Sequence, residues 1–468
     1  MTAVWMRLRA EIRTHLVATA TLVLLVGIAG GVVIGAGAGA RRTDTAFPRF
    51  LRASRAADVL VSPNATGFKG FYQDIARLPE VERAGAEAAV YLVHLSPSGQ
   101  PDFNVVPVAI LDGLGYTINR PNLLSGRLPN PDRPTEALAN RFLAARYHLH
   151  AGSTLIFLSF RHEPSDPSSV RPSDYVRLTL TITGIGIAPN EVVPVAQLDS
   201  APFLLVTPGY FRKYADPNDL GFDGLAIKLR PGTDVQRFHR GVDTLALKHQ
   251  RTIGGPAANL KDQPPSALYF FADESIHNSR VLRAIRPQSI ALALFSLLAG
   301  GAALLALGQI MARQLFVDST EYPILRGLGV TRNELVILAM ARVAIIVVAG
   351  GVIAVGLAFL ASPLFPIGPA RLAEPEPGFS LNVAFLGLGF AGIVLSLLAV
   401  AAYPAWRGAT AAGGVLGTAE VPGAERPSAS HGRPPGARPP PRSEPESGWR
   451  LSRGTAARPS RSAPRWSA

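Results

Sequence analysis

The chain has 468 residues, of which 48% are hydrophobic, so it is long enough and apolar enough to bury a large core. It contains no cysteine, which excludes a disulfide framework, a thiolate metal site and a cysteine nucleophile. Its net charge of +13 is uneven, because residues 43–285 hold 25 basic and 23 acidic residues, and most of the excess lies beside apolar segments and in the C-terminal tail. This distribution is not typical of a nucleic-acid-binding face, and no nucleic-acid partner is expected.

The first apolar segment runs from Leu16 to Ala40 and has 25 residues without a charge. Residues 1–15 precede it and are expected to form a short cytoplasmic N-terminus. A helix rises about 1.5 Å per residue, so this segment exceeds the roughly 30 Å hydrocarbon core of a bilayer and predicts the first transmembrane helix. A cleaved signal peptide is the alternative, but the apolar region of a signal peptide is typically shorter.

Within this segment, VVIGAGAGA (32–40) resembles a dinucleotide-binding turn, with Gly35, Gly37 and Ala40 spaced as G-x-G-x-x-A. The apolar run around it is far longer than a strand. The helix that would bind the phosphate would also run almost at once through Arg41 into Pro48. No cofactor is therefore expected.

The same segment contains glycines at every fourth position. Such a ridge of small residues lets another helix approach closely in lipid, and the sequence predicts helix packing there. The alternative is that a chain rich in Gly and Ala produces this spacing by chance. The glycines of the ridge are Gly27, Gly31, Gly35 and Gly39.

Residues 41–288 predict an α+β extracytoplasmic domain inserted between the first and second of four transmembrane α-helices. Strand patterns appear at 58–61, 90–95, 103–111, 177–187 and 224–232. Apolar residues at helical spacing follow the first and last of these strands: Phe68, Phe71, Ile75 and Leu78, then Val235, Phe238, Val242 and Leu245. We expect two subdomains, one built from both ends of the segment and one inserted at about 120–210.

Three more segments are long enough to span a membrane: 289–312, 335–361 and 381–402. The third span carries one charge, Arg342, which lies close enough to its helix end to snorkel to the interface. The spans leave a cytoplasmic loop at 313–334, an outer loop at 362–380 and a cytoplasmic tail at 403–468. The tail has 10 Pro and 9 Arg in its last 48 residues and is expected to be disordered from about 421.

The orientation follows from arginines in the short flanks of the spans. The positive-inside rule places both termini and the 313–334 loop in the cytoplasm of a multi-pass protein of the cell membrane, in contact with lipid. Arg41 and Arg42 then fall on the outer side, which counts against this orientation. The arginines that support it are Arg7, Arg9, Arg13, Arg313, Arg326, Arg332 and Arg407.

The 313–334 loop contains DSTEYPILRGLGVTRNE (318–334). Thr320 is expected to cap a short helix with an apolar edge formed by Tyr322, Leu325 and Leu328. Thr331 and Glu334 form a T-x-x-E capping box that begins the third span. A short amphipathic helix between two spans can pass force into both; the alternative is a helix that lies on the lipid surface.

The usual catalytic patterns are absent from the sequence. None of the five lysines stands in a G-x-x-x-x-G-K-[ST] loop, so the chain is not itself a P-loop ATPase. His148 and His150 alternate in RYHLHAG, but no third metal ligand is nearby, and His162 with Glu163 begins a zinc-protease pattern that is not completed. We expect no catalytic, cofactor-binding or metal-ligating residues.

Two stretches resemble a known family, the FtsX-like permeases of ABC transporters. Residues 122–155 resemble the MacB-type periplasmic core domain through Gly126, Arg127, Glu136, Leu149 and Gly152. The loop is similar to the R-x-x-E-x-x-x-L-R-x-L-G-x-x-R signature, although Thr320 and its neighbours replace the usual basic run. The matching residues are Glu321, Leu325, Arg326, Leu328, Gly329 and Arg332, and the resemblance assigns them contact with an ATPase. Tyr322 is added to this contact because it lies on the apolar edge of the same helix.

The resemblance implies a membrane subunit that pairs as a homodimer, or as a heterodimer with a related permease. A separate P-loop ABC ATPase would receive the apolar edge of the loop helix, and ATP hydrolysis would move the outer domains. Two alternatives stay open. One is a membrane-anchored extracytoplasmic sensor or scaffold without ATP coupling, and the other is a truncated half of a longer FtsX-like permease.

Overall fold

The computed structural model describes residues 16–65, 69–162, 171–255, 259, 263–327 and 329–411. The predictions made for residues 1–15, for Phe68, Glu163 and Leu328, and for the tail from 421 lie outside these residues.

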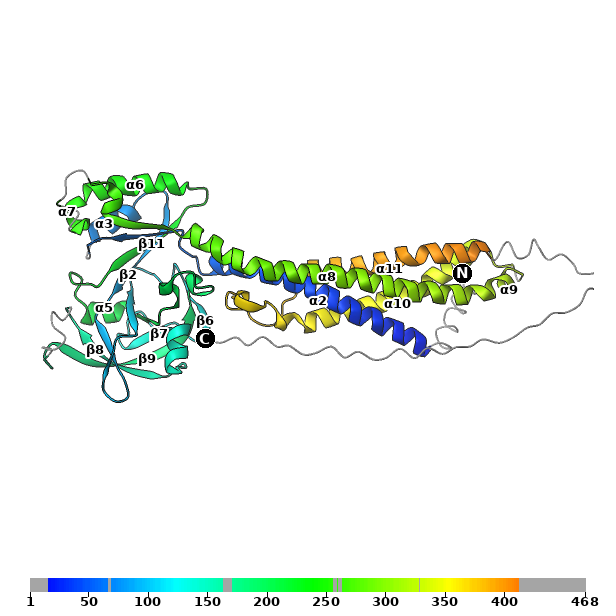
Figure 1. The fold of residues 1–468 in the computed structure, drawn as a ribbon, viewed down its shortest axis with the longest axis horizontal. Coiled ribbons are helices and arrows are strands. Elements are labelled where there is room, and N and C mark those ends of the chain that lie inside the picture. Colours follow the sequence, from blue (N-terminus) through cyan, green and yellow to red (C-terminus); the bar gives the residue numbers. More distant parts are fainter. Residues whose placement is uncertain are drawn as a thin grey trace, which may run out of the picture. The chain divides into compact units, whose positions relative to one another are not determined.

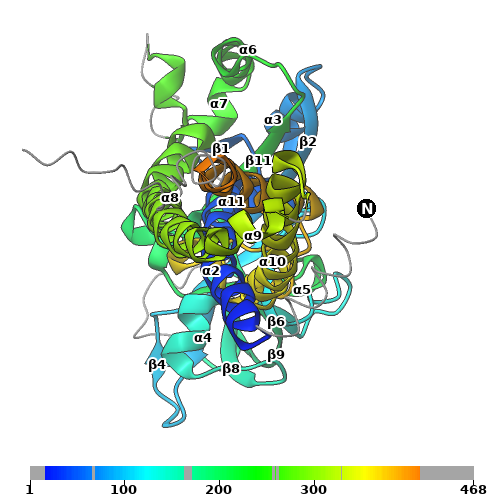
Figure 2. The same cartoon turned by 90° about the vertical axis from the view of Figure 1, so that its right-hand side faces the viewer.

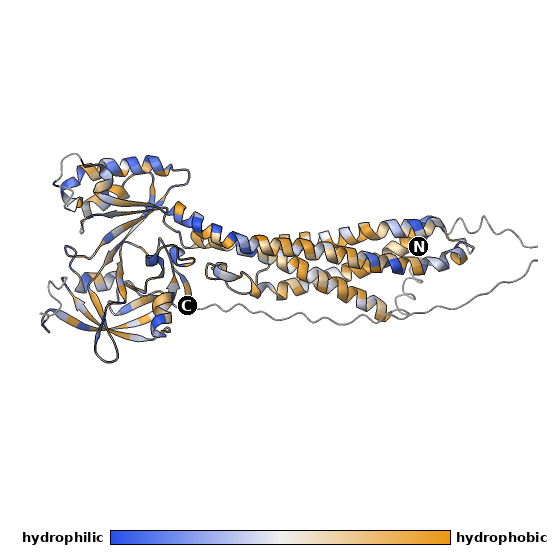
Figure 3. Ribbon diagram, viewed as in Figure 1, coloured by the Kyte–Doolittle hydropathy of each residue, from blue (hydrophilic) through white to orange (hydrophobic). Residues whose placement is uncertain are grey.

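Among the described residues, four long helices are apolar enough to cross a membrane by length and composition. They are α2 (Leu16–Ala53), α8 (Glu274–Asp318), α10 (Arg332–Leu360) and α11 (Val383–Ala411). Hydrophobic residues predominate along them, whereas hydrophilic residues gather on the first turns of α8 (Figure 3). The first two predicted spans lie inside α2 and α8, which extend well beyond them, whereas the third runs one residue past α10 and the fourth begins two residues before α11.

The extension of α2 past Ala40 has a packing cause. Ala46, Phe47 and Phe50 are at most 1% exposed and pack in one cluster with Val281 and Ile285 of α8. The buried face of α2 therefore continues past its apolar segment, and the helix continues with it.

The four helices pack against one another around a shared apolar core. α2 contacts α8 and α10, and α11 contacts α8 and α10, as Figure 2 shows along the helices. Val26 of α2, Met311 of α8, Val347 of α10 and Leu397 of α11 meet in one buried cluster.

The described residues between α2 and α8 form a mixed sheet of 12 strands with short helices (Figure 1). The strands follow the order β12-β1-β11-β2-β5-β10-β7-β9-β8-β3-β4, and β6 pairs with β9. Most neighbours are antiparallel, but β5 with β10 and β7 with β9 are parallel. The strands are β1 (Val59–Pro63), β2 (Val81–Ala89), β3 (Leu92–Leu95), β4 (Pro101–Asp102), β5 (Val106–Ile110), β6 (Asn122–Gly126), β7 (Glu136–Asn140), β8 (Thr154–Phe160), β9 (Tyr175–Ile187), β10 (Phe203–Val206), β11 (Asp223–Leu229) and β12 (Tyr269–Asp273).

Two hydrophobic clusters divide this sheet. The first lies under α3 (Lys69–Ala76) and α6 (Val235–Lys248) and uses β1, β2, β11 and β12, so it joins both ends of the segment. The second lies beneath α4 (Arg141–Tyr147) and α5 (Pro208–Tyr214). The second cluster begins at Val90 and not near 120, because β3 and β5 contribute to it.

Most patterned elements appear where the sequence predicts them. Strands cover 59–63, 92–95, 106–110, 175–187 and 223–229. Strand β2 was not predicted, because Glu82, Arg83 and Glu87 interrupt its apolar alternation although Val81, Ala86 and Ala88 are buried.

Candidate functional site

The segment between the second and third long helices is more helical than the sequence predicts. Helix α8 does not end at residue 312 but runs to Asp318, and a 3-10 turn (Ser319–Glu321) leads directly into α9 (Tyr322–Gly327). The Thr320 hydroxyl donates to the Val317 carbonyl at 2.7 Å, as hydroxyls inside helices commonly do. Thr320 therefore does not cap α9.

The apolar edge of α9 faces the chain itself. Tyr322 and Leu325 are 6% and 7% exposed and pack with Leu335 of α10 and Ala409 of α11. This corrects the expectation that they enter a partner's groove, because their surface is already covered within the chain. Leu328, the third residue of that edge, lies outside the described residues.

Other apolar side chains of this segment are open to the surroundings. Phe316, Val317 and Ile324 are 74%, 58% and 70% exposed. Glu321 is exposed, and Arg326 is half-buried.

The turn into α10 follows the predicted chemistry. Gly329 has a φ of +92°, in the left-handed region that favours glycine. The Thr331 hydroxyl accepts from the Glu334 backbone N–H at 3.4 Å, and the Glu334 carboxylate accepts from the Thr331 backbone N–H at 2.9 Å, which confirms the capping box. The guanidinium of Arg332 lies 5.3 Å from the centre of the Trp406 ring of α11.

Arg342 has a specific partner within the chain. Its guanidinium donates to the Asp318 carboxylate at 2.6 Å, and its side chain is 12% exposed. Asp318 is the last residue of α8, so this ion pair ties α8 to α10. Together with the α9 cluster, it connects the loop to three of the long helices.

The glycine ridge lies in the contact between α2 and its neighbours. An added Cβ would lie 2.6 Å from Ile353 at Gly27 and 2.8 Å from Leu357 at Gly31, both on α10. At Gly39 it would lie 2.4 Å from the Phe365 ring. Gly35 has more room, since the nearest atom would be 3.8 Å away. Gly30 and Gly350, which the ridge does not include, are as tightly packed as Gly27.

A buried charge cluster joins α2 to the loop before α11. Glu374, whose side chain is 2% exposed, accepts from Arg42 Nε at 3.2 Å and from both terminal nitrogens of Arg49 at 3.0 and 2.8 Å. Arg42 also donates to the backbone carbonyls of Ser362, Glu376 and Gly378. Arg42, which counted against the expected orientation, is therefore paired within the chain.

The sheet contributes to the same cluster. The Asn122 side chain of β6 donates to the carbonyls of Leu372 and Glu374 at 3.1 and 3.0 Å. The 362–380 loop is therefore bound to α2 and to a strand at once.

The residues that resemble the MacB-type core have structural roles. Arg127 forms a bidentate pair with the Glu136 carboxylate at 2.8 and 2.9 Å, and this pairing lowers the pKa of Glu136 to about 2. Gly126 and Gly152 have φ values of +75° and +98°, and Leu149 packs against the second cluster. These positions maintain the turns around β6, β7 and β8.

The histidine pair has a local structural role. His148 has a φ of +51° at the C-terminal cap of α4, and the His150 backbone N–H donates to the Ser153 hydroxyl. Among the described residues, no group of three or more His, Asp or Glu side chains could bind a metal ion.

Comparisons with known proteins give weak likenesses. No protein-family model matches the chain, and no curated protein matches it. Among solved structures, it is similar to the periplasmic region of MacB from Actinobacillus actinomycetemcomitans at 12% identity, with 50% of this chain and 97% of that chain covered and a TM-score of 0.29.

Two further likenesses are of similar strength. One is to a domain of a protein described as a permease from Porphyromonas gingivalis, at 13% identity, 46% and 90% coverage and a TM-score of 0.28. The other is to the extracellular domain of the noncanonic ABC-type transporter YknZ from Gram-positive bacteria, at 8% identity, 46% and 99% coverage and a TM-score of 0.26. At these values the likenesses assign neither an activity nor a partner.

Proposed function

We propose that this chain is the permease subunit of an ABC-type transporter or mechanotransmission complex, an FtsX-like permease with a MacB-like periplasmic core domain. A separate P-loop ATPase binds the segment around α9 from the cytoplasm, and two permease chains, identical or related, pair in the cell membrane. The sheet domain lies outside the cytoplasm and moves when ATP is hydrolysed.

The observation that carries this proposal is the packing of α9 against the long helices. Its buried side packs on α10 and α11, it follows α8 after a single 3-10 turn, and the ion pair between Asp318 and Arg342 closes the unit. Because packed elements transmit displacement with little compression, a force on the outer face of α9 reaches three long helices together.

The burial of Leu325 supports a different set of residues for the proposed ATPase contact. Leu325 belongs to the chain's own core, so the apolar contact is assigned to Ile324 with Phe316 and Val317, which are exposed. Glu321 remains a candidate because it is exposed on the same segment.

The test of coupling uses the tagged full chain purified from its own host's membranes, with vanadate-sensitive ATP hydrolysis as the readout. Burial of an isoleucine contributes roughly 1.5–3 kcal/mol, so Ile324→Asp should weaken co-purification of the ATPase about tenfold or more. Ile276→Asp is the matched control, because Ile276 is also exposed, at 54%, but lies in the first turn of α8.

The outcomes separate the candidate functions. Co-purifying hydrolysis that falls for Ile324→Asp and persists for Ile276→Asp supports the coupling assignment. Normal hydrolysis with Ile324→Asp refutes the contact and favours a helix on the lipid surface. No co-purifying hydrolysis from the wild-type chain would favour a sensor or scaffold.

The orientation gives a second prediction. The chain has no cysteine, so single cysteines can be introduced at Ser98, in an exposed turn between β3 and β4, and at Asn333, exposed in the first turn of α10. In intact cells, or in spheroplasts where an outer membrane is present, a membrane-impermeant maleimide should label Ser98→Cys and not Asn333→Cys. The reverse pattern would overturn the proposed orientation.

A further inference from the structure

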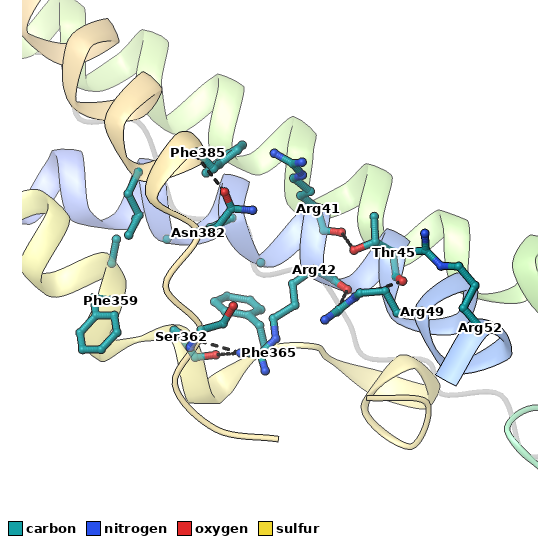
Figure 4. A pocket seen from close by; sticks show the side chains of 16 residues that line it. Arg41, Arg42, Thr45, Arg49, Arg52, Phe359, Ser362, Phe365, Asn382 and Phe385 are labelled. Atoms are coloured by element: carbon teal, nitrogen blue, oxygen red, sulfur yellow. Dashed lines mark hydrogen bonds between the residues drawn. The ribbon is translucent and has the colours of Figure 1, made fainter. Parts of the chain in front are cut away.

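A cavity of about 280 Å³ opens beside α2 just where its apolar segment ends. Its walls come from α2, from the end of α10, from the loop at Ser362 and Phe365, and from the start of α11 (Figure 4). Since Ala40 is the last residue of the uncharged run, this cavity lies at the boundary between hydrocarbon and headgroups if α2 spans a membrane.

The charged residues that line the cavity, among those described, are all positive. Among its described lining residues, four are arginines and none is acidic. Arg42 and Arg49 both pair with the carboxylate of Glu374, a residue that does not line the cavity. Arg41 and Arg52 are exposed and form no ion pair with any described residue, so two positive charges on α2 remain uncompensated at the rim.

The other wall of the cavity is apolar. Phe359, Phe385 and Leu386 line it together with the small residues Gly35 and Ala38. The Arg41 guanidinium lies 5.9 Å from the centre of the Phe385 ring, so the positively charged rim and the apolar wall lie next to each other. The volume lies near the lower limit of pockets that bind small ligands, about 300 Å³, which suits a headgroup and the start of one acyl chain.

We propose that this cavity binds one anionic phospholipid, with its phosphate on Arg41, which lies beside Phe385, with the charge of Arg52 about three turns further along α2 adding to the attraction, and with the first part of an acyl chain on Phe359, Phe385 and Leu386. Arginine suits this role because its planar guanidinium donates two hydrogen bonds to phosphate oxygens. The rest of the chain extends along the outer faces of α10 and α11, where Leu360 and Leu388 are 64% and 72% exposed. The bound lipid then bridges α2 and the start of α11. This inference requires α2 to span a membrane but does not require an ATPase.

The test is lipid binding by the full chain, purified in a nonionic detergent and measured by native mass spectrometry. The probes are dioleoyl-phosphatidylglycerol and dioleoyl-phosphatidylcholine. Phosphatidylglycerol should bind more tightly, and Arg41→Gln/Arg52→Gln should weaken its binding roughly 10- to 30-fold, since each basic residue near a membrane surface contributes on the order of 1 kcal/mol.

Two further variants test whether lipid binding depends on this cavity. Arg283→Gln/Arg286→Gln removes two exposed arginines of α8 that lie just before its own apolar segment and outside the cavity, and it should leave binding unchanged. Ala38→Trp fills the apolar part of the cavity without altering its charge, and it should weaken phosphatidylglycerol binding.

Three results would overturn the proposal. Equal loss in both arginine double variants would mean general attraction to a basic surface. Equal affinity for the two lipids would remove the role of the headgroup charge. Full displacement of phosphatidylglycerol by millimolar inorganic phosphate would mean a phosphate-ion site without an acyl-chain contribution.

Discussion

Replacing Glu374 with alanine should release the 362–380 loop from α2. The carboxylate is 2% exposed and accepts hydrogen bonds from both Arg42 and Arg49, and the Arg42 side chain is itself 9% exposed. Removal of one member of a buried charge pair typically costs about 3–5 kcal/mol, because the other charge is left without a partner. Arg42 retains three carbonyl acceptors, so we expect a cost near the lower end of this range.

Trypsin cleavage within the 362–380 loop can measure this release. Arg371 is the only lysine or arginine in the 362–380 loop, and it is exposed. Trypsin cleavage there depends on local opening, so destabilisation by about 3 kcal/mol corresponds to a rate increase of up to roughly 100-fold when opening and closing are fast. Cleavage of the Glu374→Ala protein should be measured against the wild type by the appearance of the two fragments.

A matched control lies two residues away. The side chain of Glu376 is exposed, and only its backbone carbonyl accepts from Arg42. Glu376→Ala should therefore be cleaved at the wild-type rate. Equal cleavage of Glu374→Ala and the wild type would show that the charge cluster does not restrain the loop.

Replacing Gly31 with leucine should disrupt the contact between α2 and α10. A Cβ at this position would lie 2.8 Å from the Leu357 Cβ and 3.4 Å from the Ala354 carbonyl oxygen, so neither neighbour can move away by a rotamer change alone. Overpacking costs about 1–3 kcal/mol, and a leucine on a helix pair in close contact is expected at the upper end. The melting temperature of the purified full chain should fall clearly.

Two substitutions test whether the effect comes from the contact. Gly356→Leu places the same side chain on α10 at a glycine where no atom of a described residue lies within 4 Å of an added Cβ, and it should melt like the wild type. Gly35→Ala should also be tolerated, because its Cβ would make only ordinary contacts. A Gly31→Leu protein as stable as Gly356→Leu would exclude close packing of α2 on α10.

Local features of the chain were predictable from the sequence. The capping box at Thr331 and Glu334 involves residues three positions apart, so its geometry follows from the motif itself. The apolar segments, strands β1, β9 and β11 and helix α6 likewise depend on composition and on short-range periodicity. Such patterns determine which element forms and which of its faces is apolar.

Only the tertiary structure decided what covers each apolar or charged face. The pattern of α9 identified an apolar edge at Tyr322 and Leu325, but whether that edge meets a partner or the chain's own α10 and α11 depends on how distant helices assemble. The bond between Arg42 and Glu374 joins residues 332 positions apart, and no local pattern carries that pairing. The chemistry of a side chain is a local property, whereas its partner is set by the topology of the fold. The sequence alone therefore did not determine what the loop and the glycines contact, or that the arginines line a cavity.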